Sequence, residues 1–75
     1  MLRTYTVNEW AEVNGMEVEE VTECYGEAVE FYGDIDGEME AACKRPDGTY
    51  TIFGYRGDMD VATYEEVVKY LAIEN

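Results

Sequence analysis

The chain has 75 residues, and its five Lys plus Arg against eighteen Asp plus Glu give a formal net charge of −13. A chain of this length forms a single domain over residues 1–75, and it buries only about 60% of its unfolded surface, which argues against a deep substrate cavity. Direct nucleic-acid binding draws on Lys and Arg and is therefore excluded, and the absence of His and Ser excludes Ser-His-Asp and Cys-His nucleophilic sites, so we expect no enzyme and no catalytic residue.

The first predicted element is a short helix that begins after Thr6. Thr6 and Glu9 stand three positions apart and fit a capping box, in which each side chain bonds the backbone N–H of the other. The helix is expected to bury Trp10, with Val13 as a second candidate for burial, and to end at Gly15.

Residues 16–25 carry two conflicting signals. Apolar and acidic residues each recur at steps of three and four, which is typical of a helix with two opposite faces. The apolar series is Val18, Val21, Tyr25, Ala28 and Tyr32, and the acidic series is Glu20, Glu23, Glu27, Glu30 and Asp34. Gly26 and Gly33 interrupt such a helix, and the Val and Thr content favours a strand. We expect a helix over about 17–25 and a strand over about 27–33, with strand as the alternative for 16–25.

A β-hairpin is predicted in the second half of the chain. The strands Glu38 to Lys44 and Thr49 to Tyr55 flank Arg45-Pro46-Asp47-Gly48, whose Pro-Asp-Gly order is strong turn chemistry. The residues Asp58-Met59-Asp60 that follow are expected to form a loop.

A second capping box, Thr63-Tyr64-Glu65-Glu66, predicts the start of a C-terminal helix. Its expected sheet-facing residues are Val67, Val68, Tyr70 and Leu71, with Tyr64 as a further candidate. The predicted fold class is therefore α+β, with one or two short N-terminal helices, a three-stranded antiparallel meander, and a C-terminal helix packed on one sheet face.

Charge is distributed very unevenly along the sequence. Residues 1–40 hold twelve acidic residues and one base, Arg3, whereas residues 41–75 hold six acidic residues and four bases. A solvated acidic face usually mixes the two signs, because Glu–Lys pairs at helical spacing each add a few tenths of a kcal/mol. The stretch from Glu9 to Glu40 contains no such pair, which indicates a function for the acidic residues beyond solubility.

Residues 6–25 resemble a helix-turn-helix segment of excisionase-like and repressor-type regulators. The residues that carry the resemblance are Thr6-Val7, Ala11, Gly15, Met16 and Val21. The second helix, however, reads Glu17-Val18-Glu19-Glu20-Val21-Thr22-Glu23, where a DNA reader would place Arg, Lys, Asn or Gln. The resemblance therefore implies a scaffold of helix-turn-helix ancestry without DNA binding.

In size, charge and cytoplasmic character, the whole chain resembles the small acidic inhibitors encoded by phages, which include anti-restriction, uracil-glycosylase-inhibitor and anti-CRISPR proteins. The resemblance implies that carboxylates mimic nucleic-acid phosphates. Carboxylates at helical spacing have Cβ atoms about 5–6 Å apart, close enough to imitate a DNA strand with one charge per about 3.4 Å. Rows such as Glu20-Glu23-Glu27-Glu30 and Asp34-Asp36-Glu38-Glu40 would then occupy a basic groove.

Cofactors and membrane insertion are not expected. Cys24 and Cys43 are read as two free thiols, because a zinc site would need two more ligands and the chain has no His. No stretch approaches the about 20 apolar residues that a membrane span requires, and the N-terminus has no apolar signal core, so a cytoplasmic location is expected, in a host cell if a phage encodes the chain.

The sequence predicts a non-enzymatic inhibitor of a basic nucleic-acid-binding protein or ribonucleoprotein complex. The predicted partner-binding residues are all acidic: Glu17, Glu19, Glu20, Glu23, Glu27, Glu30, Asp34, Asp36, Glu38 and Glu40. The alternative is an acidic protein–protein adaptor, or a homodimeric module, that uses apolar and aromatic anchors.

Overall fold

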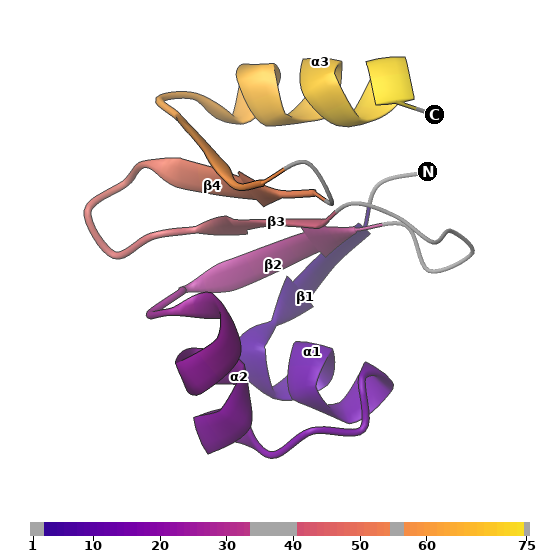
Figure 1. Cartoon of the computed structure of the whole chain (residues 1–75), viewed down its shortest axis with the longest axis vertical. Helices are drawn as coiled ribbons and strands as arrows, with labels where there is room; N and C mark the ends of the chain where they lie inside the picture. The colour runs from indigo at the N-terminus through magenta and orange to yellow at the C-terminus, as the bar shows by residue number, and fades with distance from the viewer. Residues whose placement is uncertain (1–2, 34–40, 55–56, 75) are drawn as a thin grey trace.

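Three helices and five strands make up the α+β fold of the computed structural model, which describes residues 3–33, 41–54 and 57–74. In chain order they are β1 (Arg3–Thr6), α1 (Val7–Val13), α2 (Val18–Tyr25), β2 (Glu30–Gly33), β3 (Ala41–Lys44), β4 (Tyr50–Phe53), β5 (Met59–Val61) and α3 (Tyr64–Glu74). The strands form one antiparallel sheet in the order β1-β2-β3-β4-β5. Helices α1 and α2 lie on one side of this sheet and α3 lies on the other (Figure 1).

The prediction of a three-stranded meander is wrong, because the sheet gains a strand at each edge. At one edge, β1 pairs with β2 and places Tyr5 opposite Phe31. At the other edge, Met59–Val61 pairs with β4 where the sequence predicts a loop, and the Thr51 hydroxyl donates a 2.8 Å hydrogen bond to the Asp60 carboxylate. Both edge strands are short, and their pairing with β2 and β4 extends the sheet beyond the predicted meander.

The capping predictions are confirmed where they are described. The Thr6 hydroxyl accepts from the Glu9 N–H at 3.1 Å, and the Glu9 carboxylate accepts from the Thr6 N–H at 2.8 Å. The Thr63 hydroxyl likewise accepts from the Glu66 N–H at 3.3 Å at the start of α3. Gly15 adopts φ +65°, so a residue free of a side chain makes the turn between α1 and α2.

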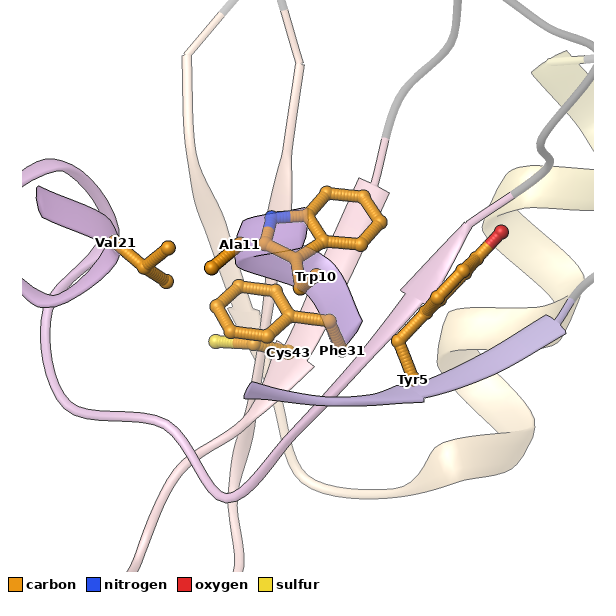
Figure 2. Packing of buried hydrophobic residues seen from close by; sticks show 6 residues of the cluster. All are labelled: Tyr5, Trp10, Ala11, Val21, Phe31 and Cys43. Carbon is orange, nitrogen blue, oxygen red and sulfur yellow. The ribbon is translucent and has the colours of Figure 1, made fainter. Parts of the chain in front are cut away.

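The core on the α1–α2 side of the sheet is mainly aromatic (Figure 2). The Trp10 ring stacks on the Phe31 ring with centroids 5.0 Å apart and planes 1° from parallel, and Tyr5 meets Trp10 edge-on at 5.2 Å. Phe31 is fully buried and Trp10 is buried, whereas Val13 is 54% exposed and does not join this core. Val13 is the last residue of α1, next to the Asn14 cap.

The α3 side of the sheet has its own core, formed by Tyr32, Ala42, Ile52, Val67 and Leu71. Burial of Val67 and Leu71 confirms the predicted face of α3, and the Tyr64 ring contacts the rings of Tyr32 and Tyr50. Val68 is 40% exposed, so its predicted contact with the sheet is wrong. It follows Val67 by about 100° around the helix and therefore lies on the flank.

Helices α1 and α2 follow one another through a short turn, as the helix-turn-helix resemblance implies, but they rest on a sheet. The third helix packs on the opposite face of that sheet (Figure 1). The described chain therefore has no tri-helical core of the kind that supports a DNA-reading helix.

Candidate functional site

The acidic residues of the two N-terminal helices form the candidate site, which we call the α1–α2 surface. Its members are Glu9, Glu12, Glu17, Glu19, Glu20, Glu23 and Glu27, and all of them are exposed. The sequence contains no Lys or Arg between Arg3 and Lys44, so neither helix carries a base of its own. Five of the predicted partner-binding residues therefore lie in one helical layer, and two acidic residues of α1 join them.

Glu30 lies apart from the α1–α2 surface, on the other face of the sheet. Strand residues two positions apart share a face, and Glu30 shares its face with Tyr32, which belongs to the α3-side core. The Tyr32 hydroxyl donates a 2.6 Å hydrogen bond to the Glu30 carboxylate, and Lys44 is directly opposite Glu30 in β3. The single predicted row Glu20-Glu23-Glu27-Glu30 is therefore wrong, because the helix ends at Gly26 and the strand turns Glu30 away.

The hydrogen bond with Glu30 and burial together change the chemistry of Tyr32. Burial of the ring is the larger cause, and the neighbouring carboxylate adds to it, so the pKa of Tyr32 is held far above its ordinary value. The contribution of this neutral hydroxyl to stability is complete below the unfolded pKa of 10.0 and falls as alkali ionises the unfolded chain. Glu30 and Tyr32 therefore have a structural function together.

The remaining predicted residues, Asp34, Asp36, Glu38 and Glu40, lie outside the described residues, as does the first part of the predicted strand Glu38 to Lys44. The candidate site is consequently built from the helical layer alone.

Helix dipoles separate the α1–α2 surface into two groups. Glu17, Glu19 and Glu20 stand at the start of α2, where negative charge is favourable, and the Glu20 carboxylate accepts from the Glu17 N–H at 3.0 Å. These residues stabilise the helix whatever else they do.

Glu12, Glu23 and Glu27 occupy the opposite kind of position. Glu12 is in the last turn of α1, Glu23 is in the last turn of α2, and Glu27 follows the α2 cap, Gly26. Negative charge near a helix C-terminus costs about 0.3–1 kcal/mol, and no base occupies the last turn of either helix. These three carboxylates oppose the dipoles of their own helices, although Arg45 offsets the dipole at the end of α2, and they are therefore the strongest candidates for partner binding.

Arg45 is the one residue of the site region that the sequence did not reveal, since the Pro-Asp-Gly motif assigned it to a turn. Its Nη1 donates 2.8 Å hydrogen bonds to the backbone carbonyls of Tyr25 and Glu27, and its Nε donates to the Thr51 hydroxyl at 3.0 Å. Its guanidinium carbon lies 5.7 Å from the centroid of the Phe53 ring. The sequence does mark Arg45 in one way, because it forms with Lys44 the only pair of adjacent basic residues.

The two cysteines lie in different surroundings. Cys24 is exposed on α2, whereas Cys43 is buried in the α1–α2-side core, and neither is in a disulfide. Burial raises the pKa of the Cys43 thiol, and the nearby Arg45 opposes that rise only in part. Within the described ranges, no three His, Cys, Asp or Glu side chains are grouped so as to hold a metal ion.

We expect one thiol to react rapidly with an aromatic disulfide reagent at neutral pH, because the thiolate is the reacting species and only Cys24 is accessible. Cys43 should react only on unfolding in urea, since its raised pKa and burial both suppress the thiolate. The C24A variant is the control and should show no rapid reaction. Two rapidly reacting thiols in the folded wild-type chain would contradict this placement of Cys43.

No protein-family model matches the chain, and neither curated proteins nor solved structures gave a significant match. Within the described part of the chain, no helix combines the length and apolar character needed to cross a membrane.

Proposed function

We propose that the chain is a non-enzymatic inhibitor that binds a basic, nucleic-acid-binding protein or ribonucleoprotein complex through the α1–α2 surface. Its exposed carboxylates take the place of phosphates and block access of the nucleic acid. We place this activity in the cytoplasm, in a host cell if a phage encodes the chain, as for the anti-restriction and anti-CRISPR inhibitors that it resembles in size and charge.

The observation that carries the proposal is the position of Glu12, Glu23 and Glu27 at helix C-terminal ends. A domain of this size has little stability to spare, since about 0.05–0.15 kcal/mol per residue is typical. Three carboxylates nevertheless oppose the helix dipoles, and neither α1 nor α2 carries a Lys or Arg of its own. Solubility alone does not require this segregation, because charges of mixed sign keep a domain soluble at lower cost.

The geometry suits a basic groove as the partner. Carboxylates three or four positions apart on a helix have Cβ atoms about 5–6 Å apart, so a row of them presents closely spaced negative charges, as a nucleic-acid strand does. Glu20 and Glu23 have this spacing within α2, whereas Glu27 follows the Gly26 cap and lies outside the helix. A groove that evolved to bind a polyanion would attract this surface from a distance and associate with it rapidly.

Affinity capture with a salt gradient tests the proposal. The immobilised chain is exposed to a nuclease-treated bacterial lysate, and bound proteins are eluted by rising salt and identified by mass spectrometry. We expect to capture a nucleic-acid-binding protein that is released from the chain by added nucleic acid. Its affinity for the chain should fall about tenfold or more between 50 and 200 mM salt. Its charge-reversed form, described in the Discussion, is the matched control bait.

Two results would refute this function. One is capture of a protein whose affinity is unchanged across the salt range, which is the behaviour of the alternative adaptor with apolar anchors. The other is a captured protein that still binds its nucleic acid while it is bound to the chain, because a phosphate mimic and the nucleic acid must compete for one groove.

A further inference from the structure

Arg45 joins the end of α2 to the middle of the sheet. Its two Nη1 hydrogen bonds, each 2.8 Å, reach the carbonyls of Tyr25 and Glu27, one on each side of Gly26. Its Nε bonds Thr51, whose hydroxyl in turn donates to Asp60 in β5 at 2.8 Å. The guanidinium therefore connects α2 with two strands that are distant from it in sequence.

This contact supplies what α2 lacks on its own. The last turn of α2 contains no base, so its C-terminal carbonyls have no local positive partner. The Arg45 guanidinium satisfies the last of these carbonyls, that of Tyr25, and offsets the negative end of the helix dipole. Arg45 is thus the positive group that holds the end of the most acidic helix.

Gly26 shows that the chain is shaped around this contact. It has φ +85°, a conformation that L side chains rarely adopt, and a Cβ added there would lie 3.1 Å from the Arg45 Nη1. A side chain at this position would therefore be strained and would also push against the guanidinium.

Few other contacts fix α2 against the sheet. Its buried side chain is Val21, and the half-buried Tyr25 ring packs on Phe31 and Phe53 with centroids 5.5 and 5.1 Å away. The rest of the helix is exposed. Loss of Arg45 would therefore free the end of α2 that carries Glu23 and precedes Glu27.

We infer that Arg45 is a positioning residue, which sets the orientation of α2 and with it the geometry of the α1–α2 surface toward its partner. The effect of Arg45 on partner binding rests on the proposed function, whereas its effect on the orientation of α2 does not. It requires the planar fork of arginine rather than its charge alone, because a lysine ammonium is a point charge that does not reach two carbonyls and a hydroxyl in one plane.

The test compares R45K with R3K, the same chemical change at an exposed residue of β1. Native-state amide hydrogen exchange of the whole chain is measured by NMR at the Gly26 N–H, which bonds the Thr22 carbonyl at 2.8 Å, and at amides of β2 to β4. We expect R45K to speed exchange of the Gly26 amide about tenfold while strand amides change far less, as when a local charge-assisted hydrogen bond is lost. R3K should match the wild type.

Unchanged exchange of the Gly26 amide in R45K would overturn the inference, and so would an equal rise at helix and strand amides, which indicates a general structural role. If R45K does not fold, T51V removes only the Nε acceptor and the bond to Asp60, and it should still speed exchange at Gly26. No change at Gly26 in folded T51V would overturn the inference in the same way.

A second readout measures affinity for the protein captured in the salt-gradient experiment. R45K keeps the net charge, so we expect weaker binding with an unchanged dependence on salt, whereas R3K should bind like the wild type. Full affinity of R45K despite faster exchange at Gly26 would overturn its positioning role. If no partner is captured, the proposed function fails, and the exchange experiment still decides whether Arg45 holds α2.

Discussion

Replacing Glu12, Glu23 and Glu27 together with lysine is expected to abolish partner binding while leaving the chain folded. Each carboxylate lies near a helix C-terminal end, where a cation is favoured by about 0.3–1 kcal/mol and an anion is disfavoured by a similar amount. Binding should fail because three positive groups would then face a basic groove. Glu20 is left unchanged, since its carboxylate accepts the Glu17 N–H and its loss would weaken the start of α2.

The matched control carries the same change in net charge away from α1 and α2, at the residue before β5 and in α3. It is the triple variant D58K, E65K and E74K. Urea unfolding followed by Trp10 fluorescence gives the free energy of unfolding, and titration calorimetry against the captured protein gives the affinity. Equal loss of affinity in test and control would show that net charge, and not the α1–α2 surface, governs binding. Failure of the test variant to fold would show that these carboxylates have a structural role.

F31A is expected to lose about 3–5 kcal/mol of unfolding free energy, the range for removing a buried aromatic ring. Phe31 is fully buried, stacks on Trp10 at 5.0 Å, and meets Tyr25 edge-on at 5.5 Å. Helices α1 and α2 both pack on this ring, so the surrounding residues have little freedom to close the cavity. A domain of this length has roughly 4–11 kcal/mol in all, so the variant should be partly unfolded at 37 °C.

Urea unfolding monitored by circular dichroism measures this loss. Trp10 fluorescence is not used here, because F31A changes the surroundings of Trp10 in the folded state. V18A is the control, because Val18 is 42% exposed and its truncation should cost under about 1 kcal/mol. A similar cost for the two variants would show that the aromatic stack on the α1–α2 side does not hold the helices to the sheet.

Local patterns predicted the parts of the fold that depend on near neighbours. The capping boxes Thr6–Glu9 and Thr63–Glu66 are contacts between residues three apart, so their residue types are enough to indicate helix starts. The Arg45–Gly48 turn is similar, with the Gly48 N–H bonded to the Arg45 carbonyl at 3.0 Å. The helix prediction for 17–25 is confirmed by α2, with the Gly26 cap at the expected break.

Elements that depend on distant partners were missed. Met59–Val61 is a strand because β4 pairs with it and Thr51 bonds Asp60, and its apolar–polar–apolar order covers only three residues, too few to predict a strand. Helical spacing likewise placed Glu30 in line with Glu23 and Glu27, because a periodic pattern does not show where the helix ends and a strand with period two begins.

The sequence by itself determined the charge of this protein and its segregation, since both are counts along the chain: every base but Arg3 lies in residues 41–75. Only the tertiary structure decided which carboxylates share a surface. Side chains repeat with a period of 3.6 residues in α2 and of two residues in β2, so the two elements direct them to different faces. It also decided that Arg45 binds the end of α2, since its hydrogen bonds to the carbonyls of Tyr25 and Glu27 form only when the chain folds back on itself.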